Sequence, residues 1–153
     1  TYPLPESQLD RFLMCITLGY PDRLSERALL AGEDRRHLAQ RLGAVMSPAQ
    51  LREAQAALAQ VHVSEALLDY LQALIAATRS GQWFLEGLSP RAGIAILRAA
   101  RARALLAQRD YVAPDDLQAI LPQTAAHRLV PVASAGRGRI EQVRAMVEAV
   151  GLP

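Results

Sequence analysis

Hydrophobic and polar positions follow a helical period along most of the chain after Pro21. Four residues that recur at spacings of three or four share one face of a predicted helix: Leu67, Leu71, Leu74 and Thr78. Such spacing places side chains on one side of an α-helix, where they can pack into a core. We expect this helix to begin after Ser64, because a serine side chain can accept a hydrogen bond from a free backbone N–H of the first turn.

Three further segments carry clear start signals for helices. Ser47-Pro48-Ala49-Gln50 combines an N-cap serine, a proline at the first helical position and a capping-box glutamine, which predicts a helix over 48–60. Ser89-Pro90 opens a helix predicted over 90–108, and Pro114-Asp115-Asp116 opens another, with acidic residues at its positive end. Shorter amphipathic patterns predict helices over 22–30 and 139–150.

The helix predicted over 90–108 has a face of small residues that allows another helix to approach closely. Its members are Gly93, Ala100, Ala104 and Ala107.

The first twenty residues have a different pattern. Tyr2 to Pro5 is expected to be extended, and Phe12 to Leu18 is a continuous apolar run bounded by Gly19-Tyr20-Pro21. That length predicts a strand buried on both faces, as in a parallel sheet. A single strand needs neighbours for its backbone groups, so we expect the rest of a sheet upstream of Thr1. Cys15, inside this run, is predicted to be a buried and inert thiol.

Composition narrows the class of protein. A chain of 153 residues, 51% hydrophobic and 21% charged, is long enough for one domain with a core. Aromatic residues are scarce and alanine and leucine dominate, so we predict an all-α fold. The sequence shows neither an apolar run long enough to cross a bilayer nor a signal peptide. With a single cysteine, these features predict a cytoplasmic location.

The charge pattern argues against several functions. All 17 basic residues other than histidine are arginine, and the net charge is only +2. A phosphate-binding P-loop needs a lysine, so a chain without lysine cannot supply a P-loop. The three histidines are scattered and there is one cysteine, so we predict no metal site.

Two arginines about eighty residues apart stand out as candidate phosphate ligands: Arg11 and Arg91. Arg91 falls in the first turn of a predicted helix, where free N–H groups and a guanidinium together suit a phosphate. The residues alone also allow a solvated Arg91 paired with Glu86. Arg11 follows Asp10, and on its own this pair reads as a surface ion pair of little value.

Several motifs resemble the MoxR family of AAA+ ATPases in order and spacing. They are Thr1-Tyr2-Pro3-Leu4-Pro5-Glu6-Ser7-Gln8-Leu9-Asp10-Arg11-Phe12, Leu18-Gly19-Tyr20-Pro21, Asp69-Tyr70, Ala77-Thr78-Arg79, Leu88-Ser89-Pro90-Arg91-Ala92, Arg109-Asp110-Tyr111-Val112 and His127-Arg128-Leu129. The resemblance covers Thr1 to Leu129. It departs from the family pattern at Leu88, at Ala113 (where a capping threonine is expected) and in the basic tail.

The resemblance implies a role for each arginine. Arg11 corresponds to the arginine finger, which reaches a neighbouring subunit's ATP and stabilises transition-state charge. Arg91 corresponds to the sensor-2 arginine, which contacts the nucleotide of its own subunit. ATP and Mg²⁺ would bind the full-length parent, with none bound tightly by this chain, which alone is expected to be inactive.

The resemblance also implies an architecture and partners. Residues 1–21 would be the end of the ATPase core, 22–129 a helical lid domain, and 130–153 a turn and helix packed on the lid. The parent would form a hexameric ring and act with von Willebrand factor A domain proteins in chaperone-like maturation of partner complexes.

Two readings from other classes remain open. Arg98, Arg101, Arg103 and Arg109 could make a basic helical module for nucleic acid, although a charged stripe opposite an alanine face is usually a solvated surface. We therefore do not expect nucleic acid among the partners. The chain could also be an interaction scaffold that ignores nucleotide.

Overall fold

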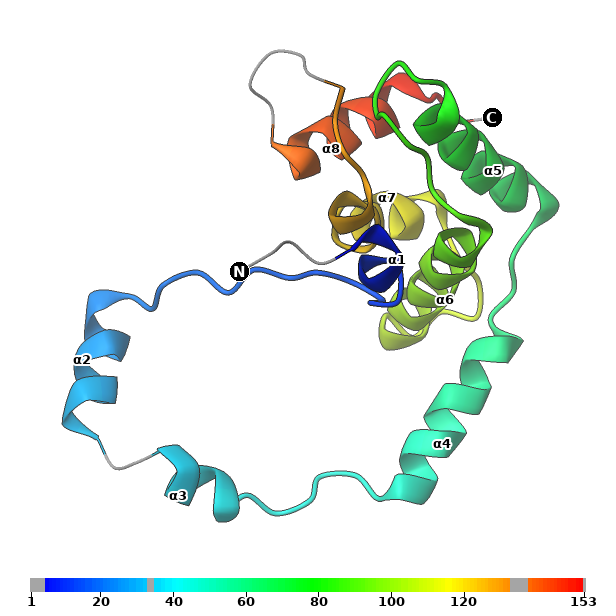
Figure 1. Cartoon of the computed structure of the whole chain (residues 1–153). Helices are drawn as coiled ribbons and strands as arrows, with labels where there is room; N and C mark the ends of the chain where they lie inside the picture. The colour runs from blue at the N-terminus through cyan, green and yellow to red at the C-terminus, as the bar shows by residue number, and fades with distance from the viewer. Residues whose placement is uncertain (1–4, 33–34, 133–137, 153) are drawn as a thin grey trace. The chain divides into compact units, whose positions relative to one another are not determined.

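The computed structural model describes residues 5–32, 35–132 and 138–152, and the chain divides into two compact units (Figure 1). One unit combines the chain up to Cys15 with the chain from Ala56 onward, and the other is Ile16–Gln55. The expectations for Tyr2–Leu4 and for most of the turn before residue 138 fall outside the described residues.

The larger unit is a bundle of four main helices. They are α5 (Glu65–Arg79), α6 (Pro90–Leu106), α7 (Pro114–Ala125) and α8 (Arg139–Ala149). Three short elements complete it: α1 (Glu6–Leu9), η1 (Leu58–Gln60) and η2 (Ala126–Arg128). Helix α7 packs against α6 and α8, while α5 contacts α6, α7 and α8. The described residues contain isolated β-bridges and no sheet, which confirms the all-α prediction.

The core lies where these helices face one another. The predicted face of α5 is confirmed, because Leu67, Leu71, Leu74 and Thr78 are all buried. Helix α6 contributes Ile96, and α8 contributes Val143 and Met146, each with no exposed surface. The largest fully buried side chains of the bundle include Tyr70, Phe84, Leu74, Ile96, Leu117, Leu121, Leu129 and Met146. Burying each such side chain stabilises the fold by about 1.5–3 kcal/mol.

Local sequence signals decide where the helices begin. Ser64 Oγ accepts from Leu67 N–H at 3.2 Å and Ser89 Oγ accepts from Ala92 N–H at 3.1 Å, as the sequence predicts. Ala113 has no such side chain at the start of α7. Asp116 compensates in part, because its Oδ2 accepts from Ala113 N–H at 2.9 Å.

The small face of α6 brings α5 close. A Cβ on Gly93 would lie 2.8 Å from Ile75 Cδ1, so the missing side chain makes room for α5. Gly93, Ala100 and Ala104 are buried as expected. Ala107 is exposed, contrary to the prediction, because α6 ends at Leu106 and Ala107 is its C-cap.

The apolar run after Arg11 does not form the buried strand expected from its pattern. Phe12, Ile16 and Leu18 are 57%, 65% and 88% exposed, and no strand pairs with this segment among the described residues. Backbone hydrogen bonds tie only its first residues to the bundle: Phe12 O accepts from Arg128 Nη2 at 2.6 Å, and Cys15 N–H donates to Gln123 O at 2.8 Å. The prediction of a buried thiol is also wrong, since Cys15 is exposed. Both errors have one cause: the expected cover was a sheet upstream of Thr1, and the described residues contain no sheet.

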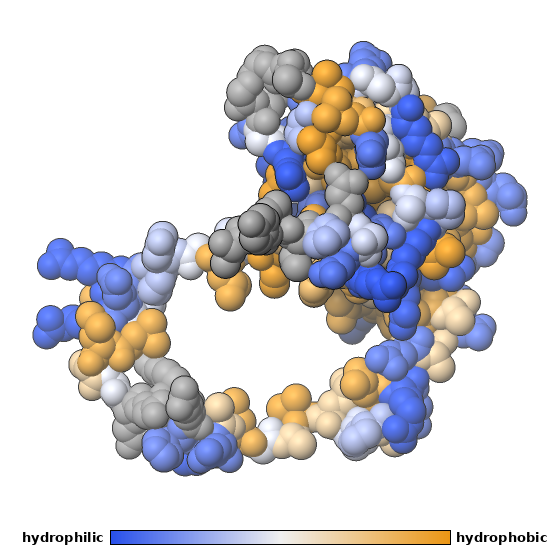
Figure 2. All heavy atoms as spheres, in the orientation of Figure 1, coloured by the Kyte–Doolittle hydropathy of each residue, from blue (hydrophilic) through white to orange (hydrophobic). Residues whose placement is uncertain are grey.

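The smaller unit contains α2 (Arg23–Ala31), α3 (Arg35–Gln40) and most of α4 (Pro48–Ala57). The predicted capping box is present, because Gln50 N–H donates to Ser47 Oγ at 3.2 Å and Ser47 N–H donates to Gln50 Oε1 at 2.8 Å. Every described side chain in this unit is exposed. Apolar side chains therefore face solvent in this unit (Figure 2), including Leu24 and Leu30 on α2 and Leu42 and Val45 between α3 and α4.

Candidate functional site

Arg91 lies in the first turn of α6, as the sequence predicts. Ser89 is the N-cap, Pro90 is the first helical residue, and Arg91 follows with an exposed side chain. The described residues show no ion pair between Arg91 and Glu86, which the alternative reading required. A cation at the positive end of a helix is disfavoured by about 0.3–1 kcal/mol unless an anion is present. This position therefore suits a guanidinium that meets a phosphate.

The loop before Arg91 is fixed by the end of α5. Thr78 Oγ1 accepts from Leu88 N–H at 3.0 Å, while the Arg79 guanidinium donates to Leu88 O at 3.0 Å through Nε and 2.7 Å through Nη2. Gly87 allows this approach, because a Cβ there would lie 2.8 Å from Arg79 Cα. The backbone of Leu88, just before α6, is thus held at both its N–H and its carbonyl oxygen.

Arg11 lies immediately after α1, in a turn on the same unit. Arg11 N–H donates to Gln8 O at 3.1 Å and Phe12 N–H donates to Leu9 O at 3.1 Å. The Arg11 side chain is exposed. Helix α1 contacts η2, which directly follows α7 in the chain (Figure 1). The turn that contains Arg11 therefore lies next to the C-terminal end of α7.

Asp10 joins the two candidate arginines through its own contacts. Ser89 Oγ donates to Asp10 Oδ2 at 3.1 Å and Oδ1 at 3.2 Å. Arg128 Nε lies 3.1 Å from Asp10 Oδ1, with side chains 5% and 28% exposed. The interpretation of Asp10 and Arg11 as a surface ion pair is therefore wrong, because the Asp10 carboxylate pairs with Arg128, a buried arginine that is distant in the sequence.

Arg128 also binds the backbone around Arg11. Its Nη2 donates to Phe12 O at 2.6 Å and to Asp10 O at 3.2 Å, and its Nη1 donates to Thr124 O. His127 Nε2 lies 3.1 Å from the same Phe12 carbonyl oxygen, so this histidine forms a hydrogen bond at the end of η2.

Burial and neighbouring charges shift the pKa values of these groups. Burial lowers the pKa of Arg128, the Asp10 carboxylate opposes that shift, and the nearby charge of Arg91 adds to it. Burial also lowers the pKa of His127, which favours its neutral form. The charge of Arg91 thus acts directly on the group that holds the Arg11 turn.

Other arginines on and after α6 are not a free basic stripe. Arg109 forms a two-bond pair with Asp116, at 2.8 and 2.7 Å, and Arg103 Nε lies 3.2 Å from Asp116 Oδ1. Asp116 is 1% exposed. Two of the four arginines in the nucleic-acid reading therefore pair with a buried carboxylate, which leaves less charge for phosphate contacts.

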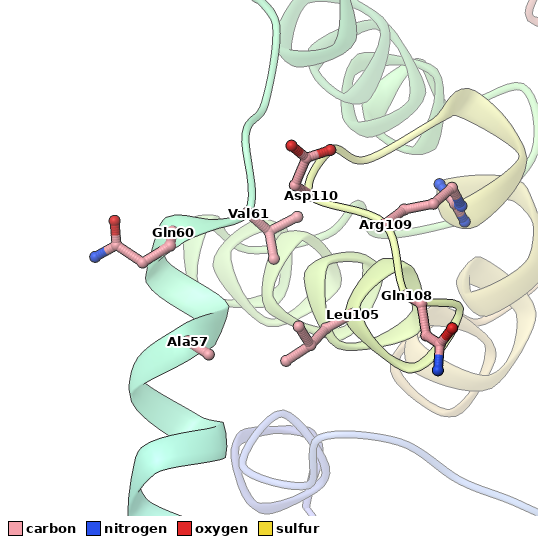
Figure 3. A pocket seen from close by; sticks show the side chains of 7 residues that line it. All are labelled: Ala57, Gln60, Val61, Leu105, Gln108, Arg109 and Asp110. Atoms are coloured by element: carbon pink, nitrogen blue, oxygen red, sulfur yellow. The ribbon is translucent and has the colours of Figure 1, made fainter.

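An apolar groove of about 430 Å³ lies at the far end of α6 (Figure 3). Ala57, Val61 and Leu105 face one another there, while the polar groups of Gln60 and Arg109 point away. Arg91 and Leu105 are separated by about 20 Å along the helix, at 1.5 Å per residue. The groove is thus separate from the two candidate arginines.

In the described part of the chain, no group of three or more histidine, cysteine or carboxylate side chains could hold a metal ion. No helix there is both long and apolar enough to cross a bilayer.

Sequence reasoning identified Arg11 and Arg91 but missed the residues that connect them. Asp10 and Arg128 both lie within motifs of the family resemblance, yet they are 118 residues apart. Their opposite charges were visible in the sequence. Nothing local indicates that they pair.

Comparison with known proteins places these features in a family. Residues 76–150 match the family described as the AAA lid domain. The chaperone MoxR1 of Mycobacterium tuberculosis is 37% identical over 145 residues, covering 84% of this chain and 36% of that protein. The protein MoxR of Methylorubrum extorquens is 30% identical over 180 residues, covering 100% of this chain and 51% of that protein.

A solved structure agrees with these relatives. The crystal structure of a candidate ATPase from Cytophaga hutchinsonii superimposes with a TM-score of 0.82 at 30% identity, covering 99% of this chain and 50% of that one. The chain spans about a third to a half of the length of the relatives it matches.

Proposed function

The chain belongs to the MoxR family of AAA+ ATPases, and we propose that it serves as the lid-bearing C-terminal portion of an ATPase that remodels or matures partner complexes. The nucleotide cradle and the Mg²⁺ ligands would come from the rest of the ATPase. A hexameric ring, a cytoplasmic location and von Willebrand factor A domain partners belong to this proposal. So do its boundaries: core remnant 1–21, lid 22–129 and packed tail 130–153.

The observation that carries the proposal is the position of Arg91. The residue is exposed in the first turn of α6, and the preceding loop is fixed by Thr78, Arg79 and Gly87. A guanidinium carried on a fixed backbone at the positive end of a helix can bind a phosphate with little reorganisation of that backbone. We assign Arg91 to the nucleotide of its own subunit, as sensor 2.

Arg11 takes the second role, as an arginine finger acting on a neighbour's ATP. Its side chain is exposed on a turn whose backbone is held by Arg128. A guanidinium that stabilises the charge of phosphoryl transfer contributes about 10³–10⁵ in rate in well-studied systems. In this chain, Arg11 supplies the charge and the turn supplies its position.

Single substitutions in the full-length ATPase test both roles. Arg11→Ala should lower kcat with little change in the KM for ATP, because its contact forms in the transition state. Arg91→Ala should lower kcat/KM and weaken nucleotide binding. The matched control is Arg98→Ala, which removes an exposed arginine two turns further along α6. Wild-type hydrolysis by Arg91→Ala would refute the sensor-2 role.

A mixing experiment tests whether Arg11 acts between subunits. Arg11→Ala subunits are combined with subunits whose P-loop lysine is replaced by alanine, each inactive alone. Hybrid rings contain interfaces where an intact P-loop meets an intact Arg11, so hydrolysis should reappear. Absence of any recovery in assembled hybrid rings would show that Arg11 does not act in trans.

The isolated chain gives a complementary test. With no lysine for a P-loop, it should neither hydrolyse ATP nor bind it tightly. Magnesium-dependent phosphate release by the purified chain would contradict this expectation. The partner assignment is tested by adding a purified von Willebrand factor A domain protein to the full-length ATPase and measuring complex formation by analytical ultracentrifugation, with and without ATP.

A further inference from the structure

Asp10 contacts two segments that are distant in the sequence and that carry different tasks. Its carboxylate accepts from Ser89 Oγ, the N-cap of the helix that presents Arg91. The same carboxylate pairs with Arg128, whose side chain is 5% exposed. Asp10 is itself adjacent to Arg11. One carboxylate therefore lies between the two candidate nucleotide ligands.

Arg128 holds the Arg11 turn on both sides. Its Nη2 donates to the carbonyl oxygens of Asp10 and Phe12, the residues before and after Arg11. Its Nη1 donates to Thr124 O on α7, which anchors the guanidinium to the bundle. A planar guanidinium with several occupied donors fixes geometry better than a flexible ammonium does. The backbone at Arg11 is thus bound to the end of α7.

The contacts set an upper limit on the separation of the two arginines. Arg11 follows Asp10 directly and Arg91 is two residues beyond Ser89, while the Asp10 and Ser89 side chains are in hydrogen-bond contact. With consecutive Cα atoms about 3.8 Å apart, the Cα atoms of Arg11 and Arg91 lie within about 20 Å of each other.

We propose that Asp10 is a positioning residue that holds Arg11 and Arg91 in one rigid frame, through Ser89 on one side and Arg128 on the other. A displacement of the start of α6 then moves the Arg11 turn with it. The nucleotide bound in one subunit would thereby set the position of the finger that acts on the neighbour's nucleotide. The frame rests on contacts of this chain alone, whereas its consequence for hydrolysis rests on the proposed function.

The local charges agree with this role. Arg91 and Arg128 are both cationic and close enough for the charge of Arg91 to lower the pKa of Arg128. Asp10 is the carboxylate that offsets this repulsion, since its charge raises the pKa of Arg128. Removing it leaves a buried arginine without its counter-charge, beside a second arginine. Such a change favours separation of the turn from the start of α6.

A distance measurement on the isolated chain tests the frame. Spin labels are placed at Arg11→Cys and Arg91→Cys in a Cys15→Ser background, and pulsed EPR measures the distribution of distances. We expect a narrow distribution that broadens clearly in Asp10→Ala. Asp69→Ala, which removes an exposed aspartate on α5, is the matched control and should leave the distribution narrow. An unchanged narrow distribution in Asp10→Ala would refute the proposal.

Two further variants distinguish loss of the contacts of Asp10 from loss of the whole fold. Asp10→Asn retains an oxygen that can accept from Ser89 but loses the charge facing Arg128, so it should broaden the distribution less than Asp10→Ala. Thermal unfolding followed by circular dichroism checks that the bundle stays folded. If Asp10→Ala unfolds, Asp10→Asn and Arg128→Lys provide the same comparison, and a wild-type distribution in both would also refute the frame.

Hydrolysis by the full-length ATPase tests the consequence. Asp10→Ala should lower kcat by about 10- to 100-fold, as misplacement of a reacting group does, with little change in the KM for ATP. An equal kcat in Asp10→Ala would refute the positioning role in catalysis. If Arg11→Ala itself hydrolyses ATP normally, the proposed function fails, while the EPR result still decides whether Asp10 holds the frame.

Discussion

Gly87→Ala provides a sharp test of how the start of α6 is built. Gly87 is exposed, so an added methyl group would normally be harmless at such a site. Here the Cβ would lie 2.2 Å from Arg79 Cγ, 2.8 Å from Arg79 Cα and 3.0 Å from Arg79 Cβ. Carbon atoms prefer about 3.5–4.0 Å. Arg79 Cγ can rotate away, but Arg79 Cα belongs to the backbone of α5, so the loop must move.

The cost follows from what the loop loses when it moves. Forcing an extra carbon into a packed site costs about 1–3 kcal/mol. The movement also weakens the buried bond from Leu88 N–H to Thr78 Oγ1 and the paired bonds from Arg79 to Leu88 O. A hydrogen bond to a charged group contributes about 1.5–3 kcal/mol. The steric cost and the cost of weakened hydrogen bonds do not add fully, because a loop that moves relieves the clash while it weakens the bonds. We therefore expect a total destabilisation of about 2–4 kcal/mol.

Urea unfolding followed by far-UV circular dichroism measures this change as a lower midpoint with an unchanged slope. At about 4 °C per kcal/mol, the Tm should fall by roughly 8–16 °C. The matched control is Gly151→Ala, because a Cβ at that position meets nothing within 4 Å. The reasoning is wrong if Gly87→Ala and Gly151→Ala unfold within about 0.5 kcal/mol of each other.

Four further predictions follow from the larger unit. Hydrogen bonds from Arg109 lower the pKa of Asp116 below its ordinary 3.8. The ionised Asp116 carboxylate therefore stabilises the fold above pH 3.8, and this stabilisation is lost as the pH falls through the folded-state pKa of Asp116. Urea midpoints measured down to about pH 3 should therefore fall less steeply in Asp116→Asn than in the wild type. Ile96→Ala opens the fully buried centre of α6 and should lower the free energy of unfolding by about 2–5 kcal/mol, whereas a loss under 1 kcal/mol would contradict that packing. Gln108 has a left-handed φ of 56° after α6, so Gln108→Gly should stabilise the chain by about 0.5–1 kcal/mol in the same urea assay. Cys15 is exposed and should react with a thiol reagent in the native chain as fast as in urea, while strong protection would show that it is covered.

Local signals in the sequence were sufficient for much of this fold. Ser64 and Ser89 begin their helices because each hydroxyl bonds a backbone N–H only three residues away. Arg91 falls in the first turn of α6 for the same reason. Hydrophobic periodicity identified the buried face of α5, since a side chain's direction on a helix depends on its position alone. The family resemblance, also read from the sequence, was confirmed by comparison with known proteins.

Other features depended on contacts that no local pattern encodes. The apolar run from Phe12 to Leu18 predicts burial, but burial needs a covering sheet, and the described residues provide none. Cys15 is exposed as a result.

By itself, the sequence determined the longer helices, their starts and the two candidate arginines, because each depends on residues within one or two turns. Only the tertiary structure decided that Asp10 pairs with Arg128 and Ser89, across 118 and 79 residues. Ion pairs and hydrogen bonds at such separations form because the packing of α6 and α7 brings the groups together. The residue next to Arg11 was read as half of a surface pair, and the fold shows it joining Arg11 to the helix of Arg91.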